Sequence, residues 1–170
     1  MNRRQMLLAS LVVITVGVAS QATLAEEHND PALIKAMSNA KVTLQQGLTA
    51  AAQEGQPISA KFEMEDGKLQ LSVYTSKGGK FSEVIVDHTS GKVAKTETIT
   101  EGEDLAAAKA QSAAMAKAKT DLKAAADKAA AQMAGSQAVS VTPETKGGRG
   151  VASVTLIAGG QFKTVEQSLE

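Results

Sequence analysis

Residues 57–74, PISAKFEMEDGKLQLSVY, alternate apolar and polar side chains on both sides of the Asp-Gly dipeptide at 66–67. Alternation with a period of two is typical of strands with one buried face, and Asp-Gly is favoured in tight hairpin turns. Gly78 and Gly79 then turn the chain into a third apolar stretch, 81–86. The sequence therefore predicts a three-stranded antiparallel meander whose apolar face needs a covering helix.

The residues before this meander, 30–55, favour helix. Asp30 is placed to cap a helix start and Pro31 suits the first turn. Thr43 and Gln46 have the spacing of a capping box, which indicates a second helix start. We interpret this segment as a helical pair or as one kinked helix.

From Glu101 the same pattern restarts. Residues 105–134 are rich in alanine and contain no Gly or Pro, so they predict a long helix, with Thr120-Asp121 as a weaker signal of a break. Three stretches with strand character follow this helix: 138–142, 151–158 and 162–165.

A short repeat supports the division into two copies. GGKFSEV at 78–84 is nearly repeated as GGQFKTV at 159–165. The first copy begins 23 residues after Gly55 and the second begins 24 residues after Gly135, and both of these glycines are expected to end helices. Self-similarity at a fixed spacing is strong evidence about architecture. The double glycines are interpreted as equivalent hairpin turns: Gly78, Gly79, Gly159 and Gly160.

The expected fold class is α+β. We predict two tandem modules, residues 30–100 and 101–170, each a helix or helix pair packed on a three-stranded antiparallel β-meander. The sequence leaves open whether the two modules share one core, pair their sheet edges or follow one another as separate units. It also leaves the oligomeric state open.

The first copy resembles a known family. Residues 44–93, which close with GGKFSEVIVDHTSGKV, are similar to the PepSY domain of bacterial envelope and secreted proteins. The second copy departs from the family pattern, because its closing stretch QFKTVEQSLE (161–170) lacks the Asp and the Ser-Gly-Lys turn, so it resembles a diverged copy. The family-motif positions in the first copy are Val86, Asp87, Ser90, Gly91, Lys92 and Val93.

The resemblance implies a binding role. PepSY domains are thought to restrain or localise peptidases by binding them, and free-standing periplasmic members carry no peptidase of their own. It implies that this chain recognises an envelope protein or peptide, with a peptidase as one candidate. We also expect that the chain is not an enzyme and uses no cofactor. The unpaired edges of a small sheet also suit the addition of an extended peptide as an extra strand.

Residues 1–25 have the three zones of a secretory signal peptide. Their apolar run is about 12 residues, and about 20 are needed to cross a bilayer. We expect cleavage after Ala25 or after Ala22, with the mature chain in the periplasm and no membrane anchor. The Arg3-Arg4 pair fits either an ordinary signal or a twin-arginine signal.

Composition excludes several classes. The chain has 18 basic and 18 acidic residues, and removing the leader with its two arginines leaves a net charge of minus two. With one Tyr, three Phe and no Trp, it lacks the basic surface and stacking aromatics of a nucleic-acid binder. The absence of cysteine excludes disulfides, thiol chemistry and a lipid-anchored cysteine.

Residues for catalysis are sparse. A nucleophile such as Ser90 or Ser153 needs a base within reach, and the chain offers only His28 and His88. No spacing among them supports a triad. Four carboxylates could pair across strands as acid and base, but alternation puts several of them on the solvent face, where they provide solubility: Glu63, Glu65, Glu83 and Asp87.

Copper binding is the alternative function, because histidine and methionine side chains are copper ligands. The candidates lack ligand spacing, so no metal site is assigned, and most of the methionines fall on expected apolar faces. They are His28, His88, Met37, Met64, Met115 and Met133.

Overall fold

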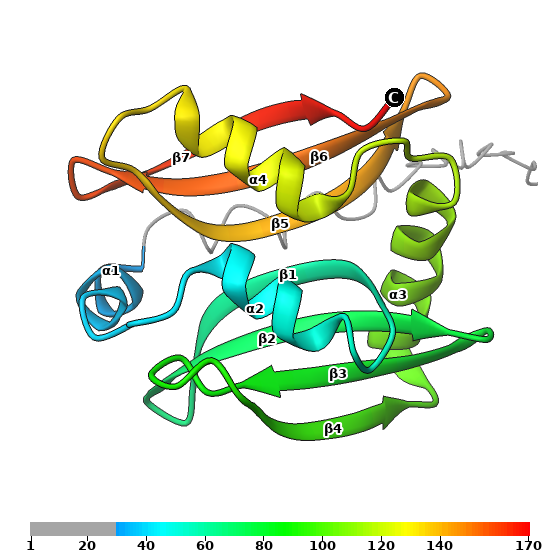
Figure 1. The fold of residues 1–170 in the computed structure, drawn as a ribbon, viewed down its shortest axis with the longest axis horizontal. Coiled ribbons are helices and arrows are strands. Elements are labelled where there is room, and N and C mark those ends of the chain that lie inside the picture. Colours follow the sequence, from blue (N-terminus) through cyan, green and yellow to red (C-terminus); the bar gives the residue numbers. More distant parts are fainter. Residues whose placement is uncertain (1–29) are drawn as a thin grey trace, which may run out of the picture.

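The computed structural model describes residues 30–170. Its strands form one antiparallel sheet with the order β4-β3-β2-β1-β5-β6-β7, so β4 and β7 are the edge strands (Figure 1). The elements are α1 (Pro31–Met37), α2 (Leu44–Ala51), β1 (Gln56–Glu65), β2 (Lys68–Lys77), β3 (Lys80–Val86), β4 (Val93–Ile99), α3 (Gly102–Met115), α4 (Leu122–Ala131), β5 (Gln137–Lys146), β6 (Arg149–Ala158) and β7 (Gln161–Ser168).

The predicted fold of two tandem modules, each with its own three-stranded meander, is wrong. β1 of the first half pairs with β5 of the second through Ala60–Val141 and Lys61–Ser140, which makes one continuous sheet. Helices α2 and α4 contact each other across this seam on one face of the sheet (Figure 1). Each half by itself would leave the backbone groups of one inner strand unpaired, and the seam satisfies both strands at once.

The first half has four strands where three were expected. β4 pairs with β3 from Phe81–Ile99 to Val86–Val93, so residues 93–99 belong to the sheet. The second half has the three expected strands, β5, β6 and β7. The two halves therefore differ at their outer edges.

The predicted helix over 105–134 is two helices. Asp121, the weaker break signal, caps α4 by accepting a hydrogen bond from the Ala124 amide at 2.7 Å. An Asp side chain competes in this way with the helical backbone and favours a new start. The helical pair in 30–55 is confirmed, with Asp30 capping α1 and Thr43 and Gln46 forming the capping box of α2.

An approximate two-fold axis relates the halves. β5 begins at Gln137, 81 positions after Gln56, where β1 begins. Both strands have a bulge two positions later, between Pro57 and Ser59 in β1 and between Ala138 and Ser140 in β5. In the seam, Ala60 pairs with Val141, which is its own equivalent at this offset, so the axis passes through that pair.

The two faces of the sheet differ in chemistry. The face under α2 and α4 carries fully buried apolar side chains, among them Phe62, Leu71, Val73, Val141 and Val154. The opposite face, called the polar face below, carries Ser59, Lys61, Glu63, Ser72 and Tyr74, as strand alternation and the β1–β2 register require. Helix α3 contacts strands of both halves, β1, β2, β5 and β6, on this polar face.

Candidate functional site

The family-motif residues form the connection between β3 and β4. Asp87 Oδ1 accepts hydrogen bonds from the Thr89 and Ser90 amides at 2.8 and 2.9 Å, and Gly91 has a φ of 74°. Hydrogen bonds from the Thr89 hydroxyl and these amides hold the pKa of the Asp87 carboxyl well below its usual range. The Lys92 carbonyl accepts from the Asp87 amide, which closes the turn. Asp87 Oδ1 is therefore engaged in shaping the turn.

This turn also holds the segment between α1 and α2. The His88 carbonyl accepts hydrogen bonds from the Lys41 and Val42 amides at 2.9 and 3.1 Å. The second half repeats the arrangement, since the Leu169 carbonyl accepts from the Lys119 and Thr120 amides. The motif thus ties the helical layer to the sheet.

We expect the Asp87 turn to make stability depend on pH in the acid range. The folded pKa is depressed, so the carboxylate stabilises the fold above the unfolded pKa of about 3.9 and this contribution is lost as pH falls below it. Asp87→Asn keeps an acceptor oxygen but removes the charge. It is expected to lower the unfolding midpoint in urea at neutral pH. It is also expected to reduce the further loss of stability as the pH falls.

Urea titrations of both proteins from neutral pH down to about pH 2 measure this difference, since the stabilisation by Asp87 is lost between its unfolded pKa and its lower folded pKa. Other carboxylates titrate in both proteins and cancel in the comparison. Parallel stability curves for the two proteins would contradict the prediction.

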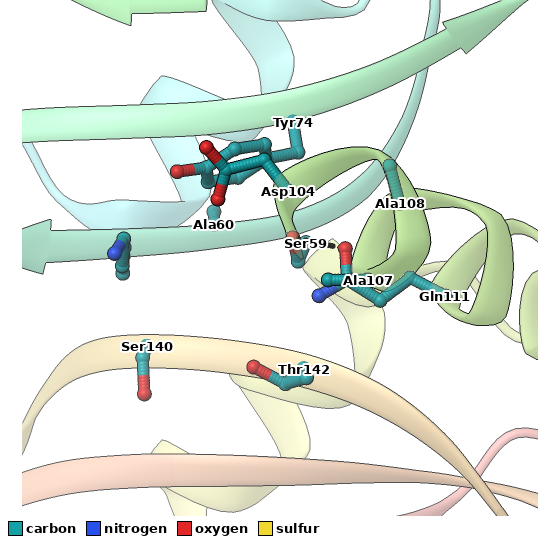
Figure 2. Close-up of a pocket in the computed structure, with 10 residues that line it drawn as sticks. Ser59, Ala60, Tyr74, Asp104, Ala107, Ala108, Gln111, Ser140 and Thr142 are labelled. Atoms are coloured by element: carbon teal, nitrogen blue, oxygen red, sulfur yellow. Dashed lines mark hydrogen bonds between the residues drawn. The ribbon is translucent and has the colours of Figure 1, made fainter. Parts of the chain in front are cut away.

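A small cavity lies on the polar face, where α3 passes over β1 and β5 (Figure 2). Its volume is about 200 Å³. Gln111 of α3 accepts a hydrogen bond from the Ser59 hydroxyl at 2.8 Å, which fixes the helix against the strand. The residues that line the cavity are Ser59, Ala60, Lys61, Tyr74, Asp104, Ala107, Ala108, Gln111, Ser140 and Thr142.

Tyr74 is one of three ionisable residues in the cavity wall, with Lys61 and Asp104. Burial raises the pKa of its phenol far above the usual value, and the carboxylates of Glu83, Glu63 and Asp104 add to the shift. The phenol therefore stays protonated and can donate a hydrogen bond at any physiological pH. Glu63 is itself engaged, by Lys61 at 2.6 Å and by the Ser72 hydroxyl at 2.8 Å.

The candidate catalytic residues do not meet in this cavity. None of Ser90, Ser153 and His88 is among its lining residues. Ser90 lies in the Asp87 turn and Ser153 lies on β6. The cavity thus offers hydroxyl, amide and phenol groups suited to hydrogen bonding, and it holds no paired nucleophile and histidine.

The candidate copper ligands are also dispersed. Met37 and Met115 are buried in the core, and Met64 and Met133 pack against it. Within residues 30–170, no group of three or more His, Cys, Asp or Glu side chains is placed to hold a metal ion. His88 Nδ1 is buried and has no hydrogen-bond partner among the described residues. His28 and the expected cleavage position Ala25 lie outside the described residues.

The double glycines lie in hairpin turns. Gly78 and Gly79 join β2 to β3, and Gly159 and Gly160 join β6 to β7, all with positive φ. A Cβ added at any of the four would meet no atom within 4 Å. Their backbone conformation, rather than close packing, explains the glycines.

The two edge strands carry the remaining candidate surface. β4 is exposed along its whole centre and has charged residues Lys95 and Glu97. β7 is mixed, with Phe162 and Val165 partly buried and Lys163 and Glu166 exposed. Within residues 30–170, the outer side of each strand is not paired with another strand.

Sequence reasoning missed the cavity and its wall residues, Tyr74, Asp104 and Gln111. They come together only because α3 crosses to the polar face, and an alanine-rich helix gives no strong signal of which face it covers.

Within the same described residues, no helix is long and apolar enough to cross a membrane. Comparison with protein-family models, curated proteins and solved structures finds no match to this chain.

Proposed function

We propose that this chain is a non-enzymatic binding protein of the bacterial periplasm, of the PepSY type. In this proposal it takes an extended segment of an envelope protein as an added strand on β7. A peptidase is the partner that the family resemblance favours, and the effect on it is restraint by binding. Export with removal of the leader brings the chain to that compartment.

The difference between the two outer edges carries the proposal. In the first half, β4 covers the outer side of β3. β7 is the equivalent of β3, at the same offset of 81 positions, since β7 begins at Gln161 and β3 at Lys80. Within the described residues the outer side of β7 is open. In this proposal, the partner strand takes the position at β7 that β4 takes at β3 in the first half.

The side chains of β7 indicate what such a segment looks like. Lys163 and Val165 lie on the helix face, because they pair with the buried Leu156 and Val154 of β6. Phe162, Thr164 and Glu166 alternate with them on the polar face. A matching strand offers apolar side chains beside Val165 and Phe162 and a carboxylate beside Lys163.

An internal competitor tests this proposal. In the first half, residues 90–99, SGKVAKTETI, follow Thr89 and form the turn and β4; Glu170 is the equivalent of Thr89. The test protein carries this ten-residue sequence after Glu170. The residues equivalent to Lys95 and Glu97 are both changed to Thr. We expect the added segment to pair with β7 and cover its outer side. A control extension of equal length has proline at every second position. Proline lacks the backbone N–H that strand pairing needs, so this extension cannot pair with β7.

The probe is an array of overlapping peptides from envelope peptidases and other envelope proteins, with peptidase activity as a second readout. We expect the unmodified protein and the proline control to bind the same peptides and slow the same peptidase. The strand extension is expected to lose both effects. Binding that survives the strand extension, or an array with no binding peptide, would overturn the proposal.

A further inference from the structure

We propose that a second copy of this chain pairs with β4, so that two copies form an antiparallel dimer centred on Thr96. This surface is separate from the proposed peptide site, because β4 and β7 lie at opposite edges of the sheet (Figure 1). The partner is thus a second copy of this chain.

The centre of β4 is an exposed strand with a charged pair. Residues 94–98 are all exposed, and the outer side of β4 is unpaired within residues 30–170. Lys95 and Glu97 form an ion pair at 2.7 Å, with side chains 62% and 52% exposed. Charged residues on an edge strand usually deter pairing with other strands. Their effect on a second copy depends on the register.

The sequence around Thr96 is complementary to itself. In an antiparallel pair centred on Thr96, Lys95 lies opposite Glu97 of the second copy, and Glu97 lies opposite its Lys95. Centring the pair on Lys95 instead sets two lysines opposite each other, and centring it on Glu97 sets two glutamates opposite each other. Opposite charges across strands stabilise pairing and like charges destabilise it. The charges therefore favour one register of this pairing.

The charge of Glu83 strengthens the preference for the register centred on Thr96. Glu83 of β3 lies directly opposite Glu97 of β4, so two carboxylates are neighbours on the polar face. In the proposed dimer, Lys95 of the second copy lies on the other side of Glu97. A cation then flanks the carboxylate pair from outside, in addition to the Lys95 of the same strand.

The proposed geometry repeats one that the chain already uses. In the seam, Ala60 and its equivalent Val141 pair across the approximate two-fold axis, and α2 and α4 of the two halves lie on the same face of the sheet. Thr96 pairing with Thr96 of the second copy places a two-fold axis normal to the sheet in the same way. The β-bulge of β4 lies between Val93 and Lys95, at one end of the Lys95–Glu97 segment around which the proposed pairing is centred. Only a short strand is paired, so the dimer is expected to be weak and reversible.

Charge exchange tests the proposal by sedimentation velocity of the purified protein, from low micromolar to submillimolar concentration. Lys95→Glu and Glu97→Lys are each expected to raise the dimer Kd about tenfold or more, because both cross-strand pairs become repulsive. An equimolar mixture of these two variants is expected to dimerise again, since the glutamates of one chain then face the lysines of the other. The double variant with both changes is expected to dimerise alone.

Lys163→Glu on β7 is the matched control and is expected to leave the dimer Kd unchanged. Circular dichroism checks that each variant is folded. We expect all of them to fold, because the substituted side chains are exposed. A protein that stays monomeric throughout would overturn the proposal, as would single variants that dimerise like the parent or a mixture that stays monomeric. None of these outcomes bears on peptide binding at β7, so the two proposals fail separately.

Discussion

Replacing Leu169 by alanine is expected to lower the free energy of unfolding by about 2 to 5 kcal/mol. The Leu169 side chain is completely buried. Its carbonyl accepts the Lys119 and Thr120 amides at 2.6 and 3.1 Å, and its own amide donates to the Gly150 carbonyl at 3.0 Å. The residue therefore joins the α3–α4 linker to the sheet, and the truncated side chain leaves a cavity at that junction.

Urea unfolding followed by far-ultraviolet circular dichroism measures the effect, since the chain has no Trp. Glu170→Ala is the matched control, because Glu170 is exposed and its loss is expected to change stability by less than about 0.5 kcal/mol. If both variants unfold at the urea concentration of the parent, burial of the Leu169 side chain does not stabilise this junction.

The diverged end of the second copy has a physical explanation in this contact. Leu169 lies 81 positions after His88, and the two carbonyls accept equivalent pairs of amides. The Ser168 hydroxyl accepts from the Glu170 amide at 3.2 Å, as Asp87 accepts from Thr89. The second copy thus keeps the anchor while its sequence has lost the motif.

Local features of the fold could be predicted from the sequence, because each depends on a few adjacent residues. The Asp30 cap, the Thr43 capping box and the turn at Asp66 are examples. The seam could not be predicted, because alternation shows which face of β1 is buried and does not show which strand lies beside it. β4 was not predicted for a related reason. Its residues VAKTETI carry no clear alternation, because the central residues of this edge strand are exposed and mostly polar.

The cavity could not be predicted because α3 has no strong apolar stripe. Ala108 and Ala114 are buried, yet alanine is common on every side of the helix. Which of them face the sheet is decided by long-range contacts such as Gln111 with Ser59. Candidate residues on β1, β2 and α3 were therefore not recognised as neighbours.

The two halves fill one pair of equivalent core positions differently. In the first half, a Cβ added at Gly47 of α2 would lie 2.5 Å from Leu71 Cδ2, so glycine makes room for the leucine beneath it. Counting from the helix caps Thr43 and Asp121, the equivalent of Gly47 is Ala125. In the sheet, the equivalent of Leu71 is Ala152, and both alanines are completely buried. A small helix residue over a large sheet residue is thus replaced by two alanines.

We expect Leu71→Ala alone to cost about 2 to 5 kcal/mol, because it leaves a cavity under Gly47. Gly47→Ala alone is expected to be destabilising by overpacking, which costs about 1 to 3 kcal/mol against a gain of about 1 from helix propensity. The double variant recreates the pair of alanines found in the second half. Its added methyl fills part of the cavity and retains the helix gain, so it is expected to be more stable than Leu71→Ala by about 1 to 2 kcal/mol.

Urea unfolding of the parent, both single variants and the double variant forms a double-mutant cycle. The sign of Gly47→Ala is expected to reverse, from destabilising in the parent chain to stabilising in the Leu71→Ala background. The exchange Thr49→Ala on the exposed side of α2 serves as the control, and its effect is expected to add independently to that of Leu71→Ala. If Gly47→Ala has the same effect in both backgrounds, the glycine is not there to accommodate Leu71. The difference between the two halves at these positions then does not reflect packing between the helix and the sheet residue.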